Sequence, residues 1–229
     1  MDIKGIQKTS LIDFPEKIAS VIFVGGCNFR CHYCHNPELI ENNLENINEN
    51  ELLEYVDKRK KYVDALVITG GEPTLQKDLI DFIKKVKEIG LSVKLDTNGS
   101  KPEVIKELIE KKLIDYIAMD VKAPFGKYYE IVQNKIDIEK IKESIKIIKG
   151  SGIDYEFRTT LLPKLLSKED IKEICNDIGK SKKYCLQQFR NNKTLNKNYR
   201  EESSYSKEDI LEIKEEIKNN FERCEVRGV

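Results

Sequence analysis

Residues 91–96 read LSVKLD, a short run in which apolar and charged side chains alternate. Because successive residues of a strand point to opposite faces of a sheet, Lys94 and Asp96 share one face while the leucines and the valine take the other. The run DYIAMDVK (115–122) repeats this pattern, with Asp120 and Lys122 on one face. A strand buried on both sides of an open parallel sheet would be apolar on both faces. One charged face therefore predicts strands that line an incompletely filled interior.

Short runs of this kind alternate with helical patterns along the whole chain. We expect strands at 18–24, 64–69, 91–96, 115–121, 153–162 and 184–189. We expect helices at about 49–60, 76–89, 102–112, 137–149, 167–179 and 206–221. Repeated strand–helix alternation predicts a parallel sheet with right-handed crossovers. A closed eight-stranded barrel needs about 250 residues. Six units in 229 residues therefore predict an α/β fold, a partial and laterally open (βα)6 TIM-like barrel.

The composition is that of an ordinary globular chain, with 39% hydrophobic and 35% charged residues. Its 40 basic and 40 acidic side chains cancel, so we expect neither nucleic acid nor a membrane as a partner. No signal-peptide pattern and no membrane-spanning apolar run is present, which predicts a cytoplasmic protein. No composition break marks a second domain, so residues 1–229 are expected to form one domain. The polar stretch 190–206 is expected to be an exposed loop, with a mobile lid as the alternative.

Three cysteines and both histidines of the chain fall within nine positions of the stretch GGCNFRCHYCHNP (25–37). In a reducing compartment such a group indicates metal or redox chemistry before disulfides. The other cysteines, Cys175, Cys185 and Cys224, occupy apolar contexts and are expected to be buried structural thiols.

Four kinds of site compete for the C-x3-C-x2-C spacing. A structural zinc site normally takes two separated pairs of ligands, and a haem attachment of the form CHYCH would leave Cys27 unused. A thioredoxin-like dithiol would leave the third cysteine without a role. An iron–sulfur cubane held by Cys27, Cys31 and Cys34 uses all three thiolates and leaves one iron open to a non-protein ligand. The cubane accounts best for the missing fourth cysteine.

The stretch CNFRCHYC (27–34) resembles the signature of the radical S-adenosylmethionine (radical SAM) superfamily, with Tyr33 as its aromatic member. The second expected strand ends in TGGEP, which is similar to that superfamily's GGE motif at Gly70, Gly71 and Glu72. The resemblance implies an oxidoreductase with a 4Fe-4S cluster, whose open iron is chelated by SAM. Reductive cleavage of SAM would then give methionine and a 5′-deoxyadenosyl radical. The two glycines would let the backbone approach the methionine part of SAM, and Glu72 would help to bind its ammonium group.

The opening GIQKTSLIDFPEKIASVIFVGGCNFRCHYCHNPEL (5–39) is similar to activating enzymes of glycyl-radical proteins. The resemblance is nearest to activators of anaerobic ribonucleoside-triphosphate reductase, with pyruvate formate-lyase activating enzymes as relatives. It implies a glycyl-radical enzyme as protein substrate and a reduced flavodoxin or ferredoxin as electron donor. The alternatives are a radical SAM enzyme that modifies a small molecule or an RNA, and a non-enzymatic zinc or electron-carrier module.

Later strand ends also resemble this group of enzymes, at DTNG (96–99), DVK (120–122), FRTTLLP (157–163) and LQQFR (186–190). By that resemblance the cofactor site is lined by Asp96, Thr97, Asn98, Arg158 and Gln188. The resemblance also places Asp120 and Lys122 as catalytic residues at the glycyl-loop end, where relatives hold a monovalent cation with acidic groups.

Two structural alternatives remain for these later motifs. DTNG is also the pattern of an Asx-type turn. Asp120 and Lys122 could form only an inward ion pair, although charges inside a barrel are expensive unless they are paired or used. No histidine follows His35, so an imidazole on the last catalytic strand is absent or replaced by Gln187 or Gln188.

Overall fold

One curved sheet lies at the centre of the fold, and its strands follow one another in sequence order. The computed structural model describes residues 1–41 and 43–229, in which eight strands are ordered from β1 to β8. β1 (Ile3–Ser10) is antiparallel to β2 (Ala19–Val24), and each later pair is parallel. The other strands are β3 (Ala65–Gly70), β4 (Ser92–Thr97), β5 (Tyr116–Asp120), β6 (Asp154–Leu161), β7 (Ser181–Gln188) and β8 (Phe221–Arg227). The expected α/β fold with parallel strands is confirmed.

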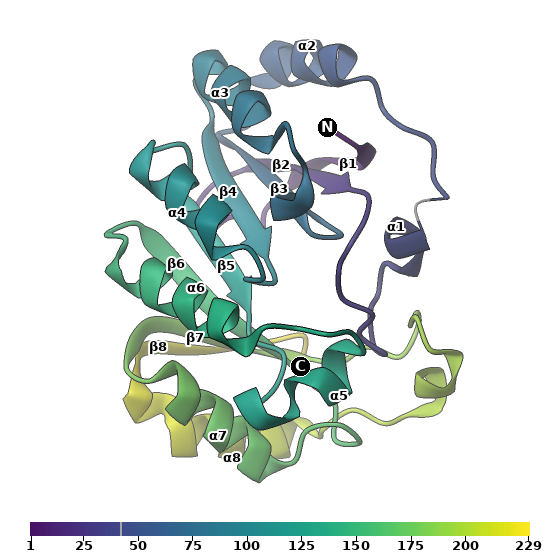
Figure 1. The fold of residues 1–229 in the computed structure, drawn as a ribbon, viewed down its shortest axis with the longest axis vertical. Coiled ribbons are helices and arrows are strands. Elements are labelled where there is room, and N and C mark those ends of the chain that lie inside the picture. Colours follow the sequence, from purple (N-terminus) through teal and green to yellow (C-terminus); the bar gives the residue numbers. More distant parts are fainter. Residues whose placement is uncertain (42) are drawn as a thin grey trace.

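The longer helices cover the outer side of this sheet (Figure 1). They are α2 (Glu49–Arg59), α3 (Leu79–Ile89), α4 (Pro102–Glu110), α6 (Ile138–Gly150), α7 (Lys168–Ile178) and α8 (Lys207–Ile217), each where the sequence predicts a helix. Two short helices, α1 (Pro37–Glu41) and α5 (Tyr128–Val132), follow β2 and β5 and were not predicted. None of the helices in the described ranges is long and apolar enough to cross a bilayer.

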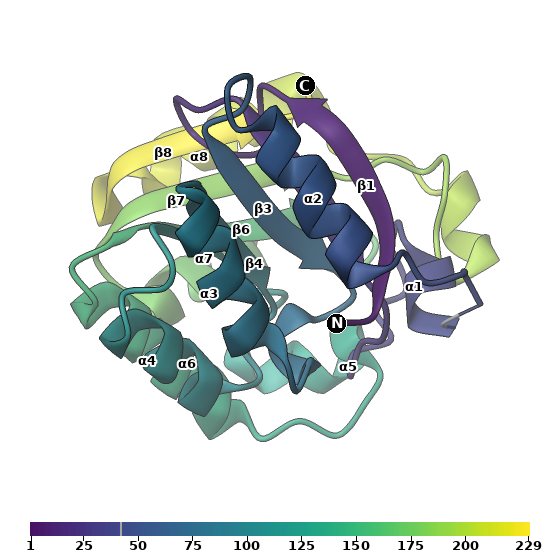
Figure 2. The ribbon, with the colours of Figure 1, turned by 90° about the horizontal axis from the view of Figure 1, so that it is seen from above.

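Two strands, β1 and β8, add to the six that the sequence predicts. Both lie at the ends of the strand order, and their partly exposed side chains are largely polar. Edge strands are often charged, because charge prevents pairing with other chains. They therefore lack the apolar runs that identified the six inner strands. Figure 2 shows the sheet curving from β1 round to β8, so that it surrounds an interior.

The interior is apolar on one side and charged on the other. Small side chains of β2, β3 and β5 pack with two aromatic rings in one cluster, formed by Phe14, Ala19, Val21, Ala65, Val67, Tyr116 and Ala118. On the charged side, Lys94 is only 2% exposed and its Nζ lies 2.6 Å from Asp96 Oδ1. The charged strand faces predicted from the sequence are thus interior faces of a partial barrel.

Candidate functional site

A cavity of about 360 Å³ lies at the carboxyl ends of the parallel strands, the edge where α/β barrels place their chemistry. It is lined by all of the residues that the sequence predicted for the site, namely Cys27, Cys31, Tyr33, Cys34, Gly70, Gly71, Glu72, Asp96, Thr97, Asn98, Asp120, Lys122, Arg158 and Gln188. Sequence reasoning did not assign His35, Asn36, Ile40, Thr69 and Thr160 to the site, although they line the same cavity. Two of them could have been predicted from their place in the sequence. His35 directly follows Cys34, and Thr160 shares a strand face with Arg158.

The three cysteines lie on the loop that follows β2, called here the cysteine loop (residues 25–37). The N–H of Cys34 donates to the carbonyl of Cys31 at 3.0 Å, which closes a turn between two of the thiols. Burial raises the pKa of Cys27 to about 11 and that of Cys31 to about 12, and burial also raises the pKa of Cys34. In the free protein these groups are therefore neutral thiols, and binding of iron would displace their protons.

The donor set of the cysteine loop bears on the metal sites considered above. All three of its thiols line the same cavity. A structural zinc ion is normally bound by four protein ligands, whereas a cubane binds each thiolate through a different iron. Three thiols on one loop at the cavity wall therefore suit an iron–sulfur cluster with one iron left open.

Neighbouring segments fix the conformation of the cysteine loop. The N–H of Phe29 donates to Sγ of Cys27 at 3.3 Å, as expected for an amide that stabilises a sulfur ligand. The N–H of Arg30 in the same loop donates to the carbonyl of Val132 in α5 at 2.8 Å. The side chain of Asn134 donates to the carbonyl of Asn28 at 2.7 Å. The segment after β5 thus holds one side of the loop.

The polar segment 190–206 holds the other side. Most of its side chains are exposed, as predicted, and it contains a turn of 3-10 helix at Lys197–Glu201. The ring of Tyr199 stacks on the ring of His32 with centroids 4.9 Å apart, and the N–H of Asn196 donates to the His32 carbonyl at 3.0 Å. Lys193 also pairs with Glu38 at 2.6 Å. These contacts tie the segment to the cysteine loop.

Glu72 connects the ends of β3 and β4 from a fully buried position. Its Oε1 accepts hydrogen bonds from the N–H and the hydroxyl of Thr74, at 3.1 and 2.5 Å, and from the hydroxyl of Thr97 at 2.7 Å. Its Oε2 accepts from the N–H of Asn98 at 2.7 Å. Burial raises the pKa of Glu72, and these hydrogen bonds oppose the rise. Both oxygens are therefore engaged in holding the cavity wall together, in addition to any contact with a ligand.

The two glycines before Glu72 are required by packing within the protein. A Cβ on Gly70 would lie 2.5 Å from the backbone nitrogen of Val24, and φ of Gly70 is +119°. A Cβ on Gly71 would lie 1.9 Å from the carbonyl oxygen of Gly26, beside Cys27. From the sequence, we expected these glycines to allow the backbone to approach the methionine part of SAM. The structure adds the close approach of the cysteine loop as a reason for them.

The DTNG segment forms the Asx-type turn that was one of the two interpretations of its sequence, and it lines the cavity. Oδ1 of Asn98 accepts from the N–H of Ser100 at 2.9 Å, which is the hydrogen bond of an Asx-type turn. The amide group of the same side chain donates to Oδ1 of Asn28 in the cysteine loop at 2.9 Å. The turn therefore lies in the cavity wall and also contacts the loop that carries the thiols.

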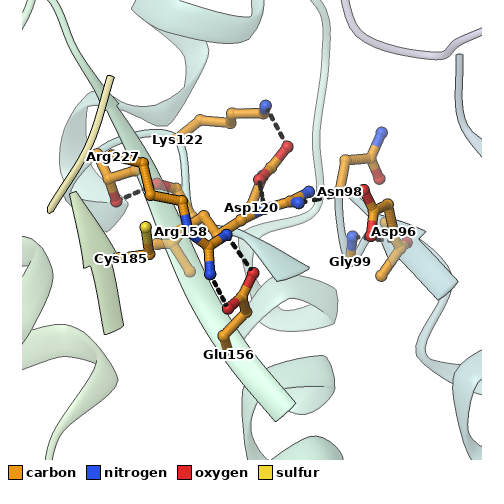
Figure 3. A network of polar contacts seen from close by, with 12 residues as sticks. Asp96, Asn98, Gly99, Asp120, Lys122, Glu156, Arg158, Cys185 and Arg227 are labelled. Carbon is orange, nitrogen blue, oxygen red and sulfur yellow. Dashed lines mark hydrogen bonds and ion pairs between the residues drawn. The ribbon is translucent and has the colours of Figure 1, made fainter. Parts of the chain in front are cut away.

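Two carboxylates of the interior share one guanidinium group (Figure 3). Nε of Arg158 lies 2.8 Å from Asp120, and Nη1 lies 3.1 Å from Asp96. Asp120 also forms the inward ion pair with Lys122 that was considered as a structural alternative, at 2.8 Å. Burial alone would raise the pKa of Asp120, but the charges of Arg158 and Lys122 hold it well below its usual range. Asp120 is therefore ionised at neutral pH.

A second ion pair lies deeper in the interior and joins β6 to β8. Both terminal nitrogens of Arg227 contact the carboxylate of Glu156, at 2.8 and 2.7 Å (Figure 3). The hydroxyl of Tyr116 donates to the same carboxylate at 3.2 Å. Burial would raise the pKa of Glu156, yet the hydrogen bonds from Arg227 and the nearby charge of Arg158 lower it to about 2. β8 thus neutralises an interior charge of β6.

Comparison with known proteins agrees with this geometry. The family model described as the Radical SAM superfamily matches residues 21–178. A protein of Methanocaldococcus jannaschii classed as a glycyl-radical enzyme activating enzyme is 39% identical over 99% of this chain and 96% of that protein. The pyruvate formate-lyase-activating enzyme of Clostridium pasteurianum is 31% identical over 77% of this chain and 75% of that enzyme.

Among solved structures, SuiB of Streptococcus suis bound to its precursor peptide SuiA matches with a TM-score of 0.68 at 16% identity. The match covers 91% of this chain and 48% of SuiB, so the chain spans about half the length of that protein. At this identity the likeness shows the fold alone.

Proposed function

The chain belongs to the radical SAM superfamily, and we propose that it generates a glycyl radical on a partner enzyme. The observation that carries the proposal is that the three thiols of the cysteine loop and the polar ends of β3, β4 and β5 line the same cavity. The two relatives named above for glycyl-radical or pyruvate formate-lyase activation support it, because together they match most of the chain. Residues 1–229 would act as one radical SAM domain.

Cys27, Cys31 and Cys34 would hold a 4Fe-4S cluster, which three thiolates suit when one iron is left for SAM. When bound, the cluster and SAM together supply a one-electron cleavage that yields a 5′-deoxyadenosyl radical. The cysteine loop keeps this site away from water, since Cys31 and Tyr33 are 6% and 3% exposed. The remaining residues serve to bind and orient.

The strand ends would divide this work between them. Gly70, Gly71 and Glu72 at the end of β3 form one wall of the cavity, and the DTNG turn with Asp96, Thr97 and Asn98 forms the adjacent wall. We assign both walls to SAM. Tyr33, Arg158 and Gln188 would complete the enclosure. Asp120 and Lys122 would orient the substrate glycine, because their charges lie at the same cavity on the next strand.

The partner would be a glycyl-radical enzyme. Anaerobic ribonucleoside-triphosphate reductase is the first candidate, because the opening motif resembles activators of that enzyme. A pyruvate formate-lyase-like enzyme is the second, because an activating enzyme of that kind is 31% identical to this chain. A reduced flavodoxin or ferredoxin in the cytoplasm would supply the electron.

The experiment uses protein that has been reconstituted with iron and sulfide without oxygen, and then given reductant, SAM and a candidate partner. The partner carries deuterium at Cα of its glycines. We expect deuterium in the 5′-deoxyadenosine and a glycyl radical signal in the electron paramagnetic resonance spectrum, which should be a doublet with unlabelled partner and collapse to a single line with the deuterated one. The same partner with its radical glycine changed to alanine should give neither signal. Cleavage of SAM without deuterium transfer from either candidate would overturn the proposal and favour a small-molecule or RNA substrate.

A further inference from the structure

Every oxygen of the Asp96 and Asp120 carboxylates already has a cationic partner from the chain itself. Figure 3 shows two of these partners, Arg158 and Lys122, beside the carboxylates. Oδ2 of Asp96 lies 3.1 Å from Arg158 and Oδ1 of Asp120 lies 2.8 Å from the same guanidinium. The remaining oxygens contact Lys94 at 2.6 Å and Lys122 at 2.8 Å. The resemblance to activating enzymes implied a monovalent cation held by acidic groups at this place. Nitrogen atoms of the chain therefore already contact all four carboxylate oxygens that such an ion would use.

The charges of this group do not call for an additional ion. Two carboxylates are surrounded by the three cationic groups of Lys94, Lys122 and Arg158, which leaves an excess of one positive charge. All five side chains are largely buried, with exposed fractions between 3% for Lys94 and 26% for Asp120. In such surroundings charges are poorly screened, so another cation would be repelled. The nearby hydroxyl of Thr97 is also engaged, since it donates to Glu72 and accepts from the N–H of Gly99 at 3.1 Å.

Arg158 is free to bridge the two aspartates because Glu156 has its own partner. Glu156 lies two residues before Arg158 on β6, and its charge alone would compete for the guanidinium. Both of its oxygens are bound by Arg227, at 2.8 and 2.7 Å. The planar guanidinium of Arg158 can therefore point one edge at each aspartate, a geometry that a spherical ion or a lysine cannot reproduce.

We propose that the Arg158 guanidinium takes the place of the monovalent cation, so that the protein needs neither sodium nor potassium. Arg158 is in this sense a positioning residue that holds β4 and β5 in register at the cavity. The excess positive charge of the group is then available to the carboxylate of SAM. The interaction of this charge with SAM rests on the proposed function, whereas the absence of a cation requirement concerns the apoprotein as well.

The first test measures the thermal unfolding of the apoprotein in tetramethylammonium, sodium and potassium chloride at one ionic strength. Tetramethylammonium is too large for a cation site between carboxylates. We expect midpoints that agree within about 1 °C, whereas an ion present at a hundred times its Kd would raise the midpoint by roughly 5–10 °C. A selective rise with sodium or potassium would overturn the proposal. Neither iron nor SAM is present, so the result is independent of whether the proposed activity is correct.

The second test changes Arg158 to Gln, which keeps hydrogen-bonding capacity and removes the charge. If the guanidinium replaces an ion, Arg158→Gln should become more stable in sodium or potassium than in tetramethylammonium. Arg223→Gln is the control, since it also removes a guanidinium, but one that is 68% exposed and pairs with Glu225 away from the two aspartates, and it should respond equally to all three salts. A lack of selective response in Arg158→Gln would show that these carboxylates form no cation site even without arginine, and would refute the replacement. Should Arg158→Gln fail to fold, the wild-type comparison still decides.

The third test uses the reconstituted protein and measures SAM binding by calorimetry in the same three salts. The Kd of the wild type should vary by less than about twofold, because no ion takes part in binding. A Kd that falls about tenfold or more with sodium or potassium alone would mean that SAM brings the cation with it, against the proposal. Failure to cleave SAM in the same samples would count against the proposed function and leave the salt comparison intact.

Discussion

Glu72 and Asn98 lie at the ends of different strands and are joined by a hydrogen bond of 2.7 Å from the Asn98 N–H to Oε2 of Glu72. With the contacts of Thr74 and Thr97, this bond makes the Glu72 carboxylate a link between two walls of the cavity. The link holds the GGE motif and the DTNG turn at a fixed separation. The shape of the cavity therefore depends on Glu72, for which the sequence analysis predicted only a contact with the ligand.

Changing Glu72 to Gln should lower the free energy of unfolding and weaken SAM binding together. A glutamine amide group would oppose one of the N–H or hydroxyl donors, and a buried unsatisfied donor costs about 1–3 kcal/mol. Urea unfolding of the apoprotein gives the stability and calorimetry gives the affinity. Glu110→Gln, at an exposed position of α4, is the control and should change neither. If the variant bound SAM more weakly but kept its full stability, Glu72 would contact the ligand without linking the two walls of the cavity.

Replacement of Cys27, Cys31 or Cys34 by alanine should reduce iron content and SAM cleavage to background. Each substitution removes one of three thiolates, and a cluster with two protein ligands is not retained. Iron and sulfide analysis and 5′-deoxyadenosine production are the measurements. Cys224→Ala, at a half-buried cysteine of β8 away from the cavity, should keep both. Equal loss in all four variants would contradict the assignment of the ligands.

Tyr199→Ala should speed the loss of iron from the reconstituted protein without changing its initial iron content. The ring stacks on His32 within the cysteine loop, and an aromatic contact of this kind is worth about 0.5–1.5 kcal/mol. Local opening of the loop, and hence the rate of iron release to a chelator, should rise by about 2- to 10-fold. Tyr62→Ala provides the control, because Tyr62 is 70% exposed after α2. Identical rates in both variants would show that segment 190–206 does not stabilise the loop.

The ion pair of Glu156 with Arg227 should stabilise the protein in a pH-dependent way. The pKa of Glu156 is lowered from an ordinary 4.5 to about 2, so the pair stabilises the fold above pH 4.5 and loses this effect as the pH falls toward 2. Arg227→Gln should lower the unfolding free energy by about 2 kcal/mol at neutral pH, less than for a fully buried pair because the arginine is partly exposed. The difference from wild type should shrink at pH 3.

The control for this pair lies on the same strand. Arg223 is 68% exposed and pairs only with Glu225 in the described part of the chain. Its change to Gln should alter stability by no more than about 0.5 kcal/mol at either pH. A difference between wild type and Arg227→Gln that stays constant from pH 7 to pH 3 would show that the arginine acts through packing and not through charge.

Gly71→Ala should prevent normal packing of the cysteine loop. The new Cβ would lie 1.9 Å from the carbonyl oxygen of Gly26, so backbone has to move beside Cys27. We expect a loss of about 3 kcal/mol or more, or no folded protein. Gly126→Ala is the matched control, since no atom lies within 4 Å of its added Cβ and its φ is not positive. Retained stability in Gly71→Ala would mean that the loop can shift freely.

The inner strands and outer helices could be predicted because their patterns are strong. LSVKLD shows a period of two, and its charged face was correctly placed in the interior, where Lys94 contacts Asp96. The helix expected at 167–179 begins where predicted, and there the hydroxyl of Ser167 accepts from the N–H of Asp170 in a capping box. β1 and β8 were missed because charged edge strands show little apolar content. α1 and α5 have five residues each, too few for a helical period to appear.

The location of the site could be predicted, but its internal contacts could not. Parallel strands bring their carboxyl ends to one edge, so motifs far apart in sequence were expected in one cavity, and the structure places them there. Which donor each carboxylate receives depends on strand register and on the rotamers of long side chains. Arg158 pairs opposite Asp120 in the ladder between β5 and β6 and also reaches Asp96 on β4. No feature of the sequence specifies that choice.

The burial of the cysteine loop also affects the protein before any iron is bound. Thiolates react with oxygen-derived oxidants much faster than thiols do. Since burial keeps the pKa of Cys27 near 11 and that of Cys31 near 12, almost none of either side chain is in the reactive form at neutral pH. Cys27 and Cys31 of the newly folded polypeptide should therefore react only slowly with such oxidants before iron is bound.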